Sequence, residues 1–307
     1  MTSEIAIMNK YSIAMATDSA VTMRHGNGEK IKTSANKLFA LSKYHPIGIM
    51  IFGNAEFMAI PWETIIKIYR KKLGIKKFDT LQEYADDFIA FLDNGNSLFP
   101  ESIQRFYLLS IVYTYFNFIN KNIDTQLDLV LTQKDEITEG EVKEITSNII
   151  KAHYKEWVEA DIIPSFPETH SKDIANKYGE NIEEIIDEVF QETPITKRHR
   201  NQLKESAINL FTKFAKNINR TEGNSGVVIA GFGERDIFPS LRAYDMEGIV
   251  LGRLKYKLSH HDEISFENDA SINAFARNEM VRAFMEGIDP SYMDAEHGYL
   301  FELFNEH

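Results

Sequence analysis

Thr2 is the residue whose type and position most directly suggest a catalytic nucleophile. Methionine is normally removed when the next residue is as small as Thr2, and its removal leaves a hydroxyl and a free α-amino group on one residue. A terminal amine titrates near pH 7.7 to 8.0, so it can accept the hydroxyl proton at neutral pH, usually through a water. The sequence therefore predicts a nucleophile that carries its own base.

Three motifs follow Thr2 in order. Residues 16–22 read Ala-Thr-Asp-Ser-Ala-Val-Thr, residues 37–39 read Lys-Leu-Phe, and residues 52–56 read Phe-Gly-Asn-Ala-Glu. A later block reads Val-Ile-Ala-Gly-Phe at 228–232 and Pro-Ser-Leu-Arg-Ala-Tyr-Asp at 239–245, before Gly248. Together these stretches resemble the proteasome β-subunit and HslV family of N-terminal nucleophile (Ntn) hydrolases. The resemblance covers the first quarter of the chain and a shorter stretch near its end.

The resemblance implies an α+β fold, the four-layer α/β/β/α sandwich of two antiparallel sheets, with a large helical insertion. It also implies that Thr2 is the nucleophile, that Asp18 and Lys37 are its charge partners, and that the Gly53 N–H stabilises the oxyanion. A buried ammonium lowers the pKa of a nearby amine and favours a developing alkoxide. A carboxylate such as Asp18 would keep that ammonium charged, because an unpaired buried ammonium is costly.

Two of these assignments leave alternatives open. The loop after Asp18 is longer than in the bacterial relative, so Lys30 and Lys32 compete with Lys37, which is preferred for its Leu-Phe context. The oxyanion donor can be Phe52 or Asn54 in place of Gly53. Each residue also has an ordinary structural interpretation, since an aspartate in a turn often binds its own backbone and an edge lysine is often solvated.

Other polar residues near the motifs are candidates for a substrate groove. This set comprises Thr17, Ser19, Thr22 and Asn54. Ser271 is a weak candidate for the serine that the family supplies from a later segment, because the later helix and closing strands have no evident counterpart here.

The elements that would position these residues follow from hydrophobic periodicity. We expect hairpins over 5–15 and over 37–52, a polar loop over 24–36, and helices over 56–72, 79–92 and 101–120. Paired strands are expected at 227–233 and 241–245, then a turn at 245–248, a strand at 249–251 and a helix over 270–285. The core is predicted in two parts, 1–121 and 223–307, around a helical insertion at 122–222.

Composition excludes several classes of protein. The formal charge is −12, which argues against affinity for nucleic acid based on phosphate neutralisation. There is no cysteine, which excludes thiolate nucleophiles, disulfides and cysteine-ligated metals. The longest apolar stretch, 106–119, is shorter than a membrane span, and no signal peptide is evident, so we expect a cytoplasmic protein that does not enter the membrane.

Two further patterns carry weak signals. The His-His-Asp-Glu run at 260–263 has metal-binding residue types, but adjacent residues point in different directions. The Gly-Asn-Gly at 26–28 lacks the setting of a phosphate loop. We therefore expect no metal and no organic cofactor.

Three functions remain under consideration. The first is a threonine hydrolase that cleaves peptide or amide bonds through an acyl-enzyme on Thr2. By resemblance it would form a homo-oligomer, such as a ring, act on a peptide or protein substrate, and work with an unfoldase. The second is a catalytically inactive assembly or interaction module, and the third is a small-molecule amidase on the same fold.

Overall fold

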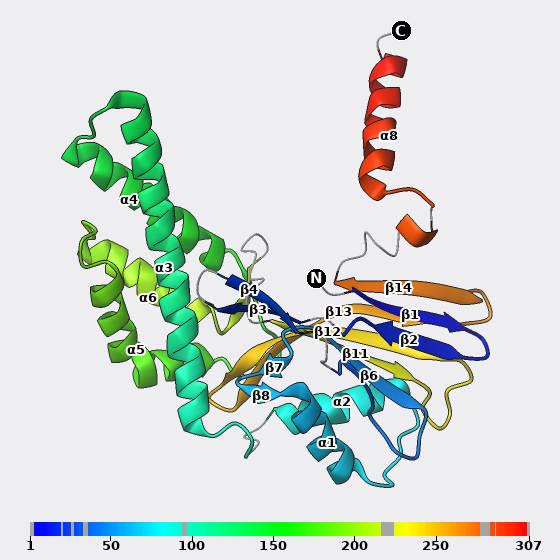
Figure 1. Ribbon diagram of the computed structural model, residues 1–307. Helices are drawn as coiled ribbons and strands as arrows, with labels where there is room; N and C mark the ends of the chain where they lie inside the picture. The colour runs from blue at the N-terminus through cyan, green and yellow to red at the C-terminus, as the bar shows by residue number, and fades with distance from the viewer. Residues whose placement is uncertain are drawn as a thin grey trace. The chain divides into compact units, whose positions relative to one another are not determined.

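The structure of the protein is a computed structural model that describes residues 3–19, 21–25, 28–32, 36–93, 97–215, 224–276, 283–285 and 287–305. The chain divides into two compact units (Figure 1). Unit 1 comprises Met1–Leu92, Glu222–Glu247 and Tyr256–His307. Unit 2 comprises Asp93–Thr221 and Gly248–Lys255.

A three-stranded antiparallel sheet in unit 1 has the order β14-β1-β2. Strands β1 (Ser3–Asn9) and β2 (Ile13–Thr17) form the first predicted hairpin, which is thereby confirmed. Its turn is held by the Asn9 side chain, whose Oδ1 accepts hydrogen bonds from the N–H groups of Tyr11 and Ser12.

Strand β14 (Ala270–Ala276) occupies the other side of β1, where the sequence predicted the start of a helix. That prediction is wrong for these residues. Residues 270–276 alternate between exposed and more buried positions, with Phe275 buried. Antiparallel pairing along the whole of β1 stabilises the strand and overrides the local helical pattern.

The second sheet of unit 1 has five strands in the order β13-β12-β11-β6-β5. Strands β5 (Leu38–Ala40) and β6 (Ile47–Gly53) confirm the second predicted hairpin, and β11 (Ser225–Gly231) pairs with β6. Strand β12 (Ser240–Val250) continues straight through the predicted turn at 245–248 and meets β13 (Arg253–Glu263) at its end.

The close packing around Gly248 explains why the turn predicted at 245–248 is wrong. A Cβ at Gly248 would lie 2.2 Å from the Tyr107 ring, so glycine is required there for close packing rather than for a turn. The actual turn is formed by Leu251 and Gly252, whose φ angles are 50° and 75°. Two successive positive φ values are typical of the tight turn between antiparallel strands.

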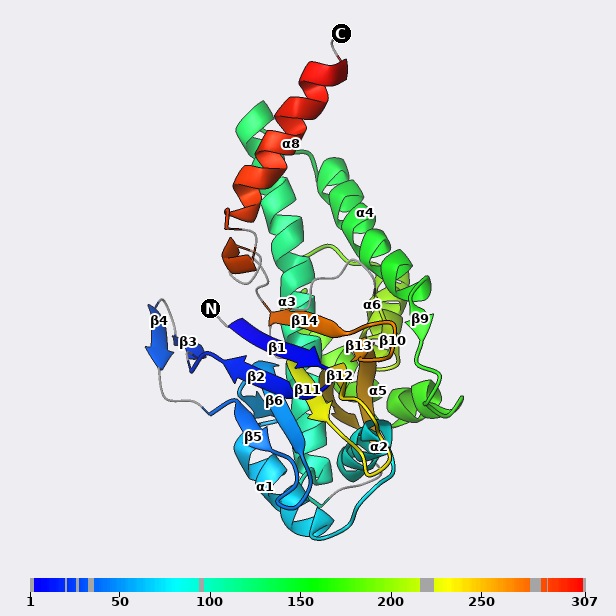
Figure 2. The same ribbon diagram turned by 90° about the vertical axis from the view of Figure 1, so that its right-hand side faces the viewer.

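The two sheets pack face to face around an apolar core (Figure 2). Ala6 and Met8 from β1 meet Met50 from β6, together with Val228 from β11 and Leu241 from β12. Helices α1 (Trp62–Leu73) and α2 (Leu81–Leu92) lie on the other face of the five-stranded sheet (Figure 1). The protein is therefore an α+β protein built on antiparallel sheets.

Two small hairpins lie outside the predicted pattern. Strands β3 (Val21–His25) and β4 (Gly28–Lys32) pair in a stretch that overlaps the polar loop predicted over 24–36, so that prediction is wrong for residues 24–25 and 28–32. Strands β7 (Glu56–Phe57) and β8 (Ile60–Pro61) occupy the predicted start of the first helix, which begins only at Trp62. Met58 and Ala59 have φ angles of 50° and 64°, which a helix does not allow.

Unit 2 is mainly helical and has its own apolar core. Its helices are α3 (Glu101–Lys134), α4 (Glu139–Val158), α5 (His170–Val189) and α6 (Lys197–Asn209), with a short pair of strands, β9 (Asp161–Ile162) and β10 (Lys213–Phe214). The predicted boundary between residues 121 and 122 falls inside α3. The helix continues past this point because Ile123 is buried in the core of the unit.

Candidate functional site

Lys37 and Asp18 form an ion pair at one end of the sandwich in unit 1. Asp18 directly follows β2, and Lys37 directly precedes β5. The Lys37 Nζ lies 2.7 Å from Asp18 Oδ1. The Lys37 side chain is only 3% exposed, whereas that of Asp18 is 32% exposed. The structure thus brings together the two charged residues that the sequence proposed as partners.

The backbone holds Lys37 firmly. Its carbonyl oxygen accepts a 2.8 Å hydrogen bond from the Ile51 N–H, which extends the β5–β6 ladder by one residue. Gly53, which ends β6, is two residues beyond Ile51. Lys37 and Gly53 therefore belong to the same end of the five-stranded sheet.

Glu4 joins this pair, although the sequence analysis did not select it. Its carboxyl group is fully buried, and its Oε1 lies 3.8 Å from the Lys37 Nζ. Glu4 pairs with Thr17 across β1 and β2 and with Phe275 across β1 and β14. It is in phase with Ala6 and Met8, both buried, and this alternation is the signal that could have identified it.

Burial is the largest influence on the pKa of Glu4. Loss of water raises its pKa to about 8, the Lys37 charge opposes this rise, and Asp18 adds to it. Neither carboxyl oxygen of Glu4 has a hydrogen-bond partner among the described residues. At neutral pH Glu4 is therefore mainly neutral, and the ion-pair partner of Lys37 at 2.7 Å is Asp18.

The turn after β6 is fixed by hydrogen bonds. Gly53 has a φ of +79°, and a Cβ there would lie 2.6 Å from the Asn224 carbonyl oxygen. The Asn54 N–H donates to the same oxygen at 3.1 Å, and Asn54 Oδ1 accepts from the Glu56 N–H. Because its N–H is already engaged, Asn54 is the weaker of the candidate oxyanion donors.

Phe52, the third candidate donor, has a packing role. Its ring lies against Gly226 and stacks on Phe275, with 5.8 Å between the ring centroids. This contact joins β6 to β14, the strand beside Glu4.

The remaining predicted residues have varied positions. Thr17 is half-buried and donates a 3.0 Å hydrogen bond to the Asp18 carbonyl oxygen. Ser19 is exposed. Thr22 lies in β3, and Lys30 and Lys32 lie in β4. Thr2 lies outside the described residues.

Ser271 does not join the Lys37 site. It pairs with Met8, five residue pairs along β14 from the partner of Ser3, which is about 17 Å along the strands. Its Oγ accepts a 3.2 Å hydrogen bond from the Asn273 side chain. The candidate role for Ser271 beside the nucleophile is therefore corrected, because the strand register places it at the opposite end of the sheet.

The His-rich run forms the end of β13. Asn273 lies 2.7 Å from His260 Nε2 and also donates a 2.7 Å hydrogen bond to Asp262. Among the described residues, no group of three or more acidic or histidine side chains could hold a metal ion.

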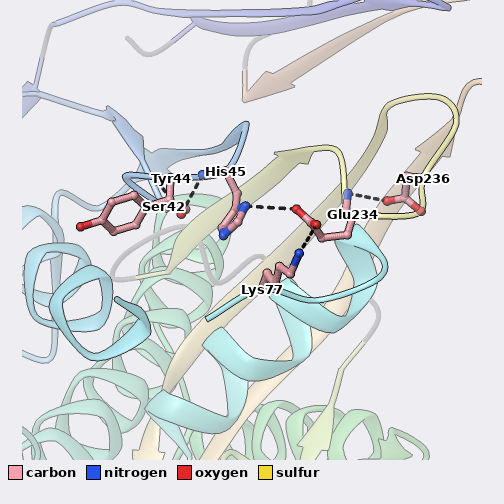
Figure 3. A network of polar contacts seen from close by, with 7 residues as sticks. Ser42, Tyr44, His45, Lys77, Glu234 and Asp236 are labelled. Carbon is pink, nitrogen blue, oxygen red and sulfur yellow. Dashed lines mark hydrogen bonds and ion pairs between the residues drawn. The ribbon is translucent and has the colours of Figure 1, made fainter. Parts of the chain in front are cut away.

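A second polar network lies at the opposite end of β6 (Figure 3). His45 Nδ1 is 3.4 Å from Glu234, which also bonds to Lys77 at 2.6 Å. The Ser42 Oγ accepts hydrogen bonds from the N–H groups of Tyr44 and His45. The network connects three loops and serves to hold them together.

No protein-family model, curated protein or solved structure matches this chain. Within the described ranges, no helix combines the length and apolar character needed to cross a bilayer.

Proposed function

We propose that this chain is an N-terminal threonine hydrolase that cleaves peptide or amide bonds through Thr2 after loss of Met1. The observation that carries the proposal is the buried Lys37 ammonium, bonded to Asp18 and 3.8 Å from Glu4. Thr2 is two residues before Glu4, and two peptide units span at most about 7 Å. This short separation in sequence is compatible with the proposed contact between the nucleophile and the Lys37 charge.

The chemistry needs no group beyond the chain and water. The Thr2 hydroxyl oxygen attacks the amide carbonyl carbon, while its proton passes through a water to the α-amine. The tetrahedral intermediate collapses, the proton moves to the leaving amine, and an ester to Thr2 remains. Water then hydrolyses the ester with the α-amine as base. The Lys37 charge lowers the pKa of the α-amine and stabilises the developing negative charge.

The four-layer arrangement and a closed homo-oligomer belong to the same proposal. The described residues supply two packed sheets and one layer of helices, α1 and α2. Substrate class within this proposal is a peptide or another acyl amide, and a panel of both would separate a peptidase from a small-molecule amidase.

The test begins with the intact mass of protein purified without an N-terminal tag, which should show loss of Met1. A β-lactone probe should then acylate the protein at residue 2. We expect Thr2→Ala to abolish labelling, Thr2→Ser to retain it, and Lys37→Met to slow it at least about a hundredfold, as for loss of a major electrostatic contribution.

Thr132→Ala is the matched control, because Thr132 lies in α3 of unit 2 and its hydroxyl donates a 2.8 Å hydrogen bond to the Asp128 carbonyl oxygen of the same helix. It should label at the normal rate. Retained Met1, or labelling that survives Thr2→Ala, would contradict the proposal and favour the inactive assembly module.

A further inference from the structure

One face of the three-stranded sheet is apolar and, in the part of the chain that the structure describes, uncovered. It is the face opposite the sandwich core. Its outward residues are Ile5 and Ile7 on β1, Ala14 and Ala16 on β2, and Ile272 and Ala274 on β14. Ile7 and Ile272 pair directly and are 45% and 43% exposed. A contiguous apolar surface of this kind marks a contact site.

Helix α8 (Pro290–Asn305) of the same chain carries a complementary surface. Four exposed side chains of α8 lie along one face of the helix, because three of them follow Tyr292 at spacings of 7, 8 and 11 residues. They are Tyr292, Tyr299, Leu300 and Leu303. Glu296 lies within this stripe, and its long side chain can reach solvent from the edge of a contact.

The two surfaces match in size. A helix of 16 residues is about 24 Å long and about 10–12 Å wide. A strand of 7 residues is about 23 Å long, and three strands are about 14 Å wide. One helix can therefore cover most of the outer face.

We propose that two copies of this chain pair by placing α8 of each on the outer face of the other's three-stranded sheet. Among the described residues of one chain both surfaces are exposed, and thirteen residues, 277–289, separate β14 from α8 in the sequence. Reciprocal exchange gives a closed two-fold dimer, because each copy supplies one helix and one sheet face.

The buried area is sufficient for such a dimer. Each helix covers about 270 Å² of sheet, so two contacts bury about 1,100 Å² on both partners, close to the lower end of specific interfaces. The pairing does not depend on Thr2 or on catalysis.

The mass of the full-length protein in solution, measured by light scattering after size-exclusion chromatography, is the first test. We expect a dimer at tens of micromolar. Ile272→Lys on the sheet and Leu303→Asp on the helix should each shift the mass to a monomer with an unchanged circular dichroism spectrum. Because Leu303 is exposed, its variant keeps the test valid if Ile272→Lys fails to fold.

Ile237→Lys is the matched control, since Ile237 is also exposed but lies between β11 and β12, away from both surfaces. It should remain dimeric. A monomeric wild type, or a dimer unaffected by both interface variants, would overturn the proposal.

Cysteine cross-linking identifies which chain supplies the helix. The protein has no cysteine, so Ile272→Cys and Leu300→Cys introduce unique thiols. When the two single variants are mixed and oxidised, we expect a disulfide between different chains. If the mixture does not cross-link and the double variant closes a disulfide within one chain, α8 covers its own sheet and the proposal is wrong. Failure of the β-lactone probe to label Thr2 would contradict the proposed hydrolase activity. It would leave the measured mass and the cross-linking result unchanged.

Discussion

Glu4 contributes to the dependence of the stability of unit 1 on pH, because it is an acid buried beside a lysine and a second acid. Its pKa is near 8 in the folded protein and near 4.5 in the unfolded chain. Between these values the folded state holds a proton that the unfolded state has lost. The free energy of unfolding therefore falls as the pH rises from about 4.5 to about 8, and it is constant on either side of this window for this group.

Glu4→Gln should remove this dependence. We expect the variant to gain about 1.4 kcal/mol relative to the wild type for each pH unit through the window, since one proton is involved. Urea unfolding at pH 4, 6 and 8 measures the difference. Equal stabilities of the two proteins at all three values would show that Glu4 titrates normally.

Gly53 tests the local geometry beside the Lys37 site. Gly53→Ala combines a positive φ with a Cβ 2.6 Å from a carbonyl oxygen, so it should lower the free energy of unfolding by about 2–3 kcal/mol. Gly74→Ala is the control, because its φ is also positive but its Cβ would meet nothing closer than 3.9 Å. It should cost about 1 kcal/mol. Equal losses in the two variants would eliminate the steric contribution at Gly53.

At the scale of elements, the start of α1 is tied to the five-stranded sheet by one buried hydroxyl. Ser225 Oγ on β11 accepts a 2.8 Å hydrogen bond from Trp62 Nε1 and donates to the Asn54 carbonyl oxygen at 3.1 Å. The turn that carries Gly53 and the start of α1 therefore meet at Ser225, which is distant from both in the sequence.

Ser225→Ala should lower the free energy of unfolding by about 1–3 kcal/mol, because it leaves the buried indole N–H without a partner. In a Trp62→Phe background the same substitution should cost less, and the difference gives the coupling energy of the pair. Chemical denaturation of the four proteins measures it. A coupling near zero would mean that the hydrogen bond contributes nothing to stability.

At the scale of the whole molecule, we expect the stabilities of the two units to change with pH in opposite directions. In unit 2, burial lowers the pKa values of His153, His170 and His199. The unfolded chain binds these protons first as the pH falls below about 6.5, so the free energy of unfolding of unit 2 decreases on acidification. In unit 1, Glu4 has the reverse effect as the pH rises toward 8.

The two tryptophans make this difference measurable. The chain has two, the buried Trp62 in unit 1 and the buried Trp157 in unit 2. Trp62→Phe leaves fluorescence that reports unit 2, and Trp157→Phe leaves fluorescence that reports unit 1. We expect thermal transitions followed by Trp157 to shift down from pH 7 to pH 5 and those followed by Trp62 to shift down from pH 6 to pH 8. Identical pH profiles for the two probes would contradict independent control of the units.

Local patterns in the sequence determined the two N-terminal hairpins and the helices near them, whereas Asp18 and Lys37 were selected through the family resemblance. Their signals lie within a few residues, such as the alternation in β1 and β2 and the turn at Asn9. Only tertiary structure decided the rest. Residues 270–276 became a strand because β1 offers them a complete row of hydrogen-bonding partners, and the same register removes Ser271 from the site. Glu4 is buried because its phase in β1 directs it between the sheets, where desolvation and Lys37 control its charge.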